Sequence, residues 1–324
     1  MILGLLDHDA GAVDPLSLQL LAAGQALAAE YGATFEVVAV GEPARALAPL
    51  LGRHGVRRLR LVTAPGADGY LAAVWAGAVL DVVRAVGATL VLGPGTDRSH
   101  EVLAGAAARA EAPLAANCIA IVPGSPCRVT RLRWAGSLLE EAELTGPLSF
   151  ATLAPHAFAA GPPQAEAPQP EVVEHAYAVP ERDLRVRLRT RTESSQGISL
   201  AEAAVVVAGG RGVGGEFGAL EELAALLGGR VGASRVATSL GWRPHADQVG
   251  QTGTRIAPDL YIACGISGAI QHMAGCRSAK RILAVNTDPE APIMRLADYV
   301  VVGDVHDVLP ALVDSVRGAR APAV

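Results

Sequence analysis

The sequence predicts an α/β protein with two doubly wound, parallel-sheet domains, of which the second is Rossmann-like. Three observations indicate this. The chain has 324 residues, more than the roughly 250 at which a single hydrophobic core stops growing. Short branched-aliphatic runs alternate with Ala- and Leu-rich stretches in both halves, as in a parallel sheet with helical connections. A Pro- and Ala-rich segment at 155–180 separates the halves. We therefore expect domains at 1–190 and 195–324.

The first half contains a repeated strand–helix pattern. The expected strands are residues 2–6, 35–40, 58–62 and 89–93, and the expected helices lie near 15–31, 43–53, 69–86 and 99–111. Beyond Asn117 the pattern changes to strand-like segments joined by turn residues, which favours an antiparallel addition to the sheet. These segments are CIAIV, RVTRLRWAG, LLEEAEL and SFATLAP.

The middle of the chain predicts a boundary. Its Pro-rich composition at 155–180 favours extended structure, and residues 182–193 alternate basic and apolar side chains, like a strand with one solvated face. Ser199 and Glu202 form a helix-start signal before the buried-strand run AVVVAGG. Further strands are expected at 230–232, 260–264, 281–286 and 299–303, and helices near 217–228, 267–275, 292–296 and 306–318.

Composition excludes several function classes. Hydrophobic residues make up 51% of the chain, but no apolar run approaches the roughly 20 residues of a membrane span. The start MILGLLDHDAG lacks a basic region before its apolar run, so we expect no secretory signal and a cytoplasmic protein. A net charge of -5 and 4% aromatic residues argue against nucleic-acid binding. The four cysteines show no metal-site spacing, so no metal is expected.

Polar residues concentrate in loops after the second set of strands, and in an open parallel sheet ligands bind at these strand ends. Residues 210–215 satisfy G-x-G-x-x-G, which alone indicates either a pyrophosphate cradle or a tight turn without a ligand. The next strand ends in Gly-Ala-Ser-Arg at 232–235. Since a dehydrogenase needs an acidic residue there for the ribose, NAD is disfavoured, whereas Arg235 leaves NADP open.

Three later loops offer further ligand contacts. Residues 248–254 carry two amides and two hydroxyls, which is typical of a ligand clamp or of a polar surface turn. Gly and Ser at 265–268 precede a helix and present N–H groups to an anion. His272 in that helix is a structural or an active histidine. Asn286 can recognise an adenine edge, while Asp288 and Asp304 can cap turns and helices. No hydrolytic motif is present.

Taken together and in order, these loops resemble the alpha subunit of electron-transfer flavoproteins. The segments that carry the resemblance are GGRG, VGASR, QVGQTG, YIACGISGAIQHMAG, AVNTDPEAPI and ADYVVVGD. The likeness covers the whole carboxyl-terminal domain, whereas the first domain agrees in architecture. Two departures concern partner choice: the loop after the VVVA strand is shorter than in some relatives, and Ala116, Asn117 and Cys118 stand where a more acidic stretch is expected.

The resemblance implies that the second domain carries FAD. The residues that correspond to flavin-contacting positions are Arg211, Ser234, Arg235, Val249, Gly250, Gln251, Thr252, Ser267, Gly268, Ala269, Ile270, Gln271, His272, Asn286 and Asp304. It implies that Thr252 bonds the flavin N5 edge, that Arg235 lies near the ring and that His272 approaches the O2 side. Such groups stabilise negative charge on a reduced flavin, so we expect an anionic semiquinone.

The resemblance further implies a heterodimer with a beta subunit that holds AMP or, in bifurcating relatives, a second FAD. The implied function is a one-electron carrier without catalytic residues of its own. It accepts electrons from acyl-CoA or other flavin dehydrogenases, as in fatty acid oxidation, and delivers them to a respiratory-chain quinone oxidoreductase. The alternatives are a subunit of an electron-bifurcating complex, an NADP-dependent oxidoreductase, and a structural partner without its flavin.

Overall fold

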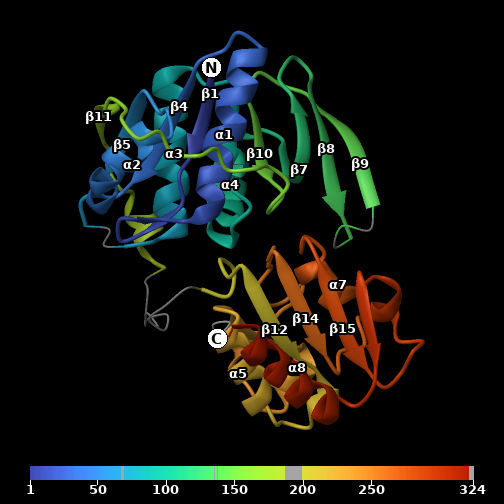
Figure 1. Ribbon diagram of the computed structural model, residues 1–324. Helices are drawn as coiled ribbons and strands as arrows, with labels where there is room; N and C mark the ends of the chain where they lie inside the picture. The colour runs from blue at the N-terminus through green and yellow to red at the C-terminus, as the bar shows by residue number, and fades with distance from the viewer. Residues whose placement is uncertain (67–68, 135, 137, 187–198, 321–324) are drawn as a thin grey trace. The chain divides into compact units, whose positions relative to one another are not determined.

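The computed structural model describes residues 1–66, 69–134, 136, 138–186 and 199–320. The chain divides into two compact units, Met1–Glu193 and Ser194–Val324. In each unit, helices cover a central, mainly parallel sheet (Figure 1). The predicted fold class, two α/β units with doubly wound sheets, is confirmed.

The first unit contains a nine-stranded sheet in the order β11-β5-β4-β1-β6-β10-β7-β8-β9. The strands are β1 (Ile2–Leu5), β4 (Phe35–Val40), β5 (Arg58–Thr63), β6 (Leu90–Gly93), β7 (Leu114–Val122), β8 (Cys127–Arg133), β9 (Leu138–Leu144), β10 (Ser149–Leu153) and β11 (Glu171–Ala176). The helices are α1 (Pro15–Glu30), α2 (Ala48–Arg53), α3 (Ala72–Val86) and α4 (Asp97–Ala110), with 3-10 turns η1 (Glu42–Leu47) and η2 (Glu181–Leu184). A small ribbon, β2 (His8–Asp9) and β3 (Ala12–Val13), follows β1.

Alternation along the central strands divides the first core between the two faces of the sheet. Leu3 and Leu5 of β1 pack in one cluster with side chains of α3 and α4. Ile2 and Leu92 point to the other face, where they cluster with Leu20 of α1. Because both faces are covered, these strands are apolar at nearly every position, as parallel strands require. The strands and helices expected before residue 112 are confirmed close to their predicted bounds, except that the helix expected near 43–53 begins as the 3-10 turn η1 and is α-helical only in α2.

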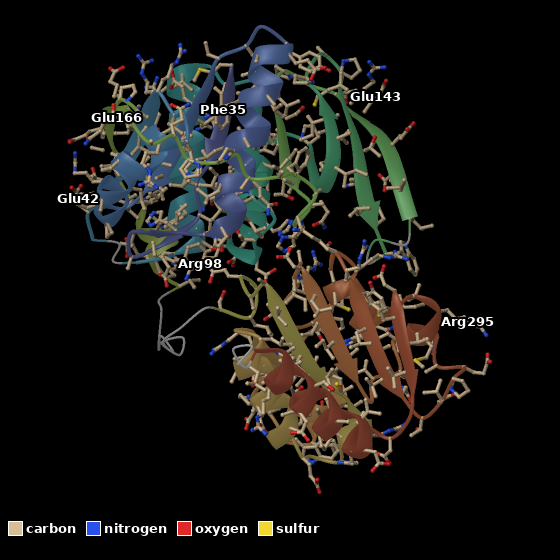
Figure 2. The ribbon with its side chains drawn as sticks, in the orientation of Figure 1. Phe35, Glu42, Arg98, Glu143, Glu166 and Arg295 are labelled. Atoms are coloured by element: carbon tan, nitrogen blue, oxygen red, sulfur yellow. The ribbon has the colours of Figure 1, made fainter. Side chains whose placement is uncertain are left out.

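The segment SFATLAP was expected in the antiparallel addition, and this is wrong. β8 and β9 are antiparallel, and Glu143 lies on exposed β9 (Figure 2). β10, however, pairs in parallel with both β6 and β7. The reason is burial: every residue of β10 is buried, so the strand fits the centre of the sheet rather than a half-exposed margin.

The Pro-rich segment at 155–180 does not separate the two units, which corrects its interpretation as a boundary. It contains β11, which pairs in parallel with β5 and so returns to the first sheet. Residues 181–184 form η2 rather than the start of a strand, and Asp183 there is buried against Arg109 of α4, which donates two hydrogen bonds of 2.9 and 3.0 Å to its carboxylate. The rest of the strand expected at 182–193 lies largely outside the described residues, which resume at 199.

The second unit contains a five-stranded, all-parallel sheet in the order β13-β12-β14-β15-β16. Its strands are β12 (Val205–Gly209), β13 (Arg230–Ala233), β14 (Leu260–Cys264), β15 (Ile282–Asn286) and β16 (Tyr299–Val302). The helices are α5 (Gly218–Leu226), α6 (Arg235–Ser239), α7 (Ile270–Cys276) and α8 (Val305–Arg320), with 3-10 turns η3 (Arg211–Val213), η4 (His245–Asp247) and η5 (Pro292–Arg295). Val207 faces α5 and α8, and Val206 faces the side of α7 and η5.

Three local expectations for the second unit need correction. Ser199 and Glu202 hydrogen-bond as a helix cap would, with Ser199 Oγ to Glu202 Oε2 at 2.5 Å, but they close a turn rather than a helix. The helix expected at 267–275 begins at Ile270, which leaves 267–269 as loop, and that at 292–296 is a 3-10 turn. Within the described residues, no helix is long and apolar enough to cross a membrane, and no cluster of His, Cys, Asp and Glu could hold a metal.

Candidate functional site

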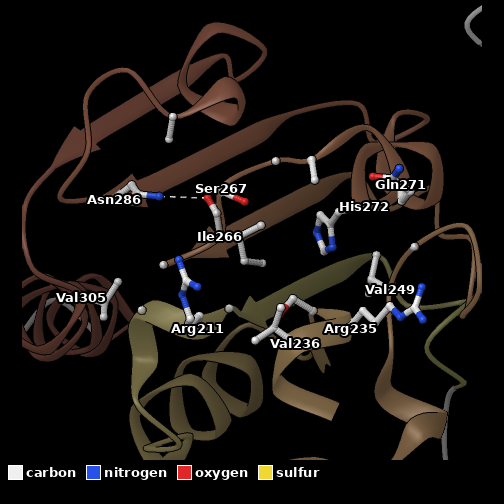
Figure 3. Close-up of a pocket in the computed structure, with 18 of the residues that line it drawn as sticks. Arg211, Arg235, Val236, Val249, Ile266, Ser267, Gln271, His272, Asn286 and Val305 are labelled. Carbon is white, nitrogen blue, oxygen red and sulfur yellow. Dashed lines mark hydrogen bonds between the residues drawn. The ribbon is translucent and has the colours of Figure 1, made fainter. Parts of the chain in front are cut away.

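A cavity of about 850 Å³ lies at the carboxyl edge of the second sheet, where the loops after all five strands meet (Figure 3). Its lining includes every residue for which the sequence predicted a flavin contact except Ile270, whose side chain is 67% exposed. The predicted residues that line it are Arg211, Ser234, Arg235, Val249, Gly250, Gln251, Thr252, Ser267, Gly268, Ala269, Gln271, His272, Asn286 and Asp304. Its volume is within the range of small-molecule and cofactor sites.

The glycine loop after β12 is joined to the loop after β14. The N–H of Gly210 donates to Cys264 O at 2.9 Å, and that of Gly212 donates to Gly265 O at 3.1 Å. Gly265 has φ +61°, and a Cβ on it would lie 2.7 Å from Gly212 Cα, so only glycine fits this approach. Two of the N–H groups expected to cradle a pyrophosphate are therefore used within the protein, which weakens the dinucleotide-fingerprint interpretation of 210–215.

The loop between β14 and α7 supplies the unused backbone donors instead. Among the described residues, the N–H groups of Ser267, Gly268 and Ala269 donate no hydrogen bond to protein atoms. Gly268 has φ +79° and packs so closely on η5 that a Cβ would lie 2.5 Å from Ile293 Cβ. Three consecutive N–H groups that line a cavity and have no protein acceptor suit an anionic ligand, because together they can donate to one anion.

Two guanidinium groups share this cavity. Arg211 and Arg235 enter it from the side of β12 and β13, as Figure 3 shows. Within the described part of the chain neither forms an ion pair with a carboxylate. Ser234 caps α6 by accepting a hydrogen bond from Ala237 N at 3.3 Å, which fixes the direction in which Arg235 leaves the strand end. The cavity thus offers positive charge that the protein itself does not neutralise.

The loop at 248–254 is fixed at both ends. Val249 N donates to Ala233 O of β13 at 2.9 Å, and Gln251 N donates to Gln271 O of α7 at 2.7 Å. Inside the loop, Gln248 is only 3% exposed, and its Nε2 donates to Thr252 Oγ1 at 3.0 Å. The clamp interpretation placed Gln248 in this loop, but the resemblance did not identify it as a site residue. The structure adds it as a support for Thr252.

His272 is buried at the wall of the cavity. Its Nε2 lies 2.6 Å from the hydroxyl of Tyr261, which is completely buried. Burial lowers the pKa of His272 to about 4, although the nearby Val249 backbone opposes part of this shift. The ring is therefore neutral at pH 7. Its Nδ1 has no hydrogen-bond partner among the described residues, and an orphaned buried polar atom beside a cavity fits a polar ligand.

Asn286 and Asp304, which both line the cavity, also have structural roles. Asn286 donates from Nδ2 to Ile266 O at 3.0 Å and accepts from Asp288 N at 3.0 Å, so it joins the β14 and β15 loops (dashed line in Figure 3). Asp304 accepts from His306 N at 2.9 Å at the start of α8. The capping interpretation of Asp304 is confirmed, and its carboxylate still lines the cavity.

Sequence reasoning missed an apolar wall. Val236 of α6 and Leu240, which follows that helix, line the cavity together with Ile266. Val236 is 44% exposed and Leu240 is 55% exposed. A five-residue helix shows no readable periodicity, so α6 gave no signal of its own. Free N–H groups and cations beside an apolar wall suit a ligand that has an anionic part and a flat apolar part. The residues present therefore fit FAD.

Comparison with known proteins gives the same result. The model described as "Electron transfer flavoprotein domain" matches residues 2–180, and the "Electron transfer flavoprotein FAD-binding domain" matches residues 199–277. Proteins named electron transfer flavoprotein subunit alpha are 35% identical in Clostridium acetobutylicum (96% of this chain, 95% of the relative), 34% in Bacillus subtilis (95% and 94%) and 35% in Mycobacterium leprae (98% of both). The chain therefore belongs to the family of electron transfer flavoprotein alpha subunits.

Proposed function

We propose that this protein holds one FAD in the cavity of its second unit and works as an electron carrier. The observation that supports it most is the meeting of three free backbone N–H groups, at 267–269, with two guanidinium groups that have no carboxylate partner within the described residues. Phosphate groups are the usual ligands of such donors and cations. Bound FAD would supply the redox chemistry, since a flavin can exchange its two electrons singly.

Each part of the cavity has a separate task in this proposal. The N–H groups at 267–269 and the Arg211 guanidinium hold the pyrophosphate. Arg235, Thr252 and His272 contact the flavin ring, whereas Val236 and Leu240 keep water from it. Because His272 is neutral at pH 7, its contribution is a hydrogen bond rather than a positive charge. Arg235 is therefore the fixed positive charge that favours negative charge on the reduced ring.

The finer assignments belong to the same proposal. The partner is a beta subunit, contacted chiefly by the first unit, and it holds AMP. Electrons arrive from acyl-CoA or other flavin dehydrogenases and leave to a quinone oxidoreductase. A cytoplasmic location is part of the proposal, and cell fractionation tests it. The second candidate, a subunit of a bifurcating complex, requires an additional FAD in the partner, so the number of flavins per heterodimer distinguishes the two.

The test is to purify the chain together with its beta subunit and to measure flavin content and absorption. We expect one tightly bound FAD per alpha chain, a yellow complex, and reduction by a dehydrogenase partner but not by NADPH alone. Titration with dithionite should then show a one-electron stage. A correctly assembled complex that stays colourless in excess FAD would contradict the proposal, and reduction by NADPH with turnover of a small substrate would favour the oxidoreductase instead.

A further inference from the structure

We propose that Gln248 controls the direction of the hydrogen bond that Thr252 offers to the bound ligand, so that the Thr252 hydroxyl can either donate or accept. This inference rests on the proposed function, in which the cavity holds FAD and Thr252 faces the flavin N5 edge. Gln248 then acts as a positioning residue, since it works through Thr252.

Three side chains form a continuous hydrogen-bonded chain that leads from Thr238 to the cavity, which Gln248 and Thr252 line. Thr238 Oγ1 lies 2.7 Å from Gln248 Oε1, and Gln248 Nε2 lies 3.0 Å from Thr252 Oγ1. Thr238 Oγ1 also lies 3.1 Å from the carbonyl oxygen of Arg235. The backbone of Gln248 is held in place, because its N–H donates to His245 O at 2.9 Å and its carbonyl accepts from Thr254 N at 2.7 Å.

The positions of the hydrogens follow from counting donors. A threonine hydroxyl has one proton and can also accept, whereas the two ends of a glutamine amide differ, one being an acceptor and the other a donor. In the first arrangement Thr238 donates to Gln248 Oε1, and Gln248 Nε2 donates to Thr252. The proton of Thr252 is then unused within the chain, and it is free to point into the cavity.

The opposite arrangement is equally complete. If the Gln248 amide turns over, its Nε2 donates to Thr238, and its Oε1 accepts from Thr252. The proton of Thr238 is not stranded, because the Arg235 carbonyl lies within 3.1 Å. Thr252 then presents only lone pairs to the cavity. Since burial makes an unpaired polar group costly, the existence of two fully paired arrangements is what permits the reversal.

A reversible hydroxyl matches the chemistry of a flavin. N5 of oxidised flavin is a bare nitrogen that accepts a hydrogen bond, whereas N5 of fully reduced flavin carries a hydrogen and donates one. A fixed donor would pair with the first form and oppose the second. Through the amide rotation, Thr252 can pair with both forms without gaining or losing a proton.

The test is nitrogen-15 NMR of the full heterodimer that carries FAD labelled at N5, in the oxidised and the fully reduced states at pH 8. The Thr252→Val variant gives the N5 chemical shifts of FAD that lacks this hydrogen bond. Gln248→Glu places an acceptor-only carboxylate beside Thr252, which captures the threonine proton. We expect its oxidised N5 resonance to move to the Thr252→Val position, while its reduced N5 resonance stays at the wild-type position. The dissociation constant for FAD should change by less than about tenfold.

Charge alone is controlled by Arg255→Gln, which makes the net charge more negative by the same one unit at an exposed residue that follows this loop and does not line the cavity. It should not move the oxidised N5 resonance selectively. The proposal is overturned if Gln248→Glu leaves the oxidised resonance unchanged, if both states move equally, or if Arg255→Gln reproduces the effect. If Gln248→Glu does not fold, the N5 resonances of wild type and Thr252→Val still test the proposal. It requires that the wild-type N5 is hydrogen-bonded in both the oxidised and the reduced state. A wild-type complex that does not bind FAD would instead refute the proposed function.

Discussion

Arg235 is the first residue of α6, and its exposed side chain lines the cavity without a carboxylate partner among the described residues. If it lies beside the flavin, Arg235→Ala should lower the potential of the first one-electron reduction by roughly 50–100 mV, because a positive charge near the ring favours the electron. Potentiometric titration of the purified heterodimer measures this change.

The matched control for Arg235 is Arg281→Ala. Arg281 precedes β15, at the amino-terminal end of the sheet and away from the cavity, where it pairs with Asp298 at 3.4 Å. This variant should keep the wild-type potential. Equal potentials for wild type and Arg235→Ala would remove Arg235 from the proposed flavin contacts.

His272 predicts a pH dependence of stability. Its pKa is about 4 in the folded protein and about 6.5 in an unfolded chain. Between these values the unfolded state binds the extra proton, so the free energy of unfolding falls as the pH drops from 6.5 towards 4. The full loss amounts to roughly 3 kcal/mol. Because His272→Gln removes this titration, the stability advantage of wild type over the variant should shrink through this range.

Urea denaturation of the flavin-free protein at pH 7, 6, 5 and 4.5 measures the difference in the free energy of unfolding between wild type and His272→Gln. His306→Gln, which replaces an exposed histidine of α8 in the same unit, should retain the wild-type pH dependence. If the free energies of unfolding of wild type and His272→Gln differed by the same amount at every pH from 7 to 4.5, the buried imidazole would not be the titrating group.

At the scale of elements, the strands of the second unit were predictable because each is a short run of mainly apolar residues between turn residues. The position of the site followed from one rule, that ligands bind at the carboxyl ends of parallel strands. Gln248 could not be found in this way, because its amide acts through Thr252 and the sequence does not indicate which side chains meet. Helix α6, with its apolar wall, is too short for periodicity to reveal.

The errors in the first unit have a related cause. Strand direction in β10 and the pairing of β11 depend on contacts with strands far away in the sequence, β6 and β5 respectively. Local composition carries no information about such partners. The Pro-rich stretch before β11 resembled a linker because proline favours extended chain in either setting.

The junction between the β12 and β14 loops gives a prediction at this scale. Gly265→Ala adds a Cβ at φ +61°, 2.7 Å from Gly212 Cα, whereas Gly214→Ala adds one at the same φ in open space. Both variants should lose stability, by about 1–3 kcal/mol from backbone strain. Only Gly265→Ala should also weaken FAD binding by tenfold or more, since it pushes apart two loops that line the cavity.

Isothermal titration of the flavin-free protein with FAD distinguishes these variants, and thermal unfolding reports the shared strain. If Gly214→Ala weakened FAD binding as much as Gly265→Ala, general loosening of the unit rather than the loop junction would account for the loss.

At the scale of the whole molecule, the cavity belongs to one unit alone. Every residue that lines it lies between Gly210 and Val305, after the division of the chain at Glu193. The first unit has its own core and sheet. FAD binding therefore should order the second unit directly.

Hydrogen exchange of the heterodimer with and without FAD tests this most directly, because it reports each segment of the chain separately. We expect FAD to slow exchange in the loops that follow the five strands of the second unit, most strongly at 248–254 and 265–272, and to leave the first sheet unchanged. If FAD binds but protects segments of the first unit, or none of these loops, the central claim that they hold the flavin is wrong.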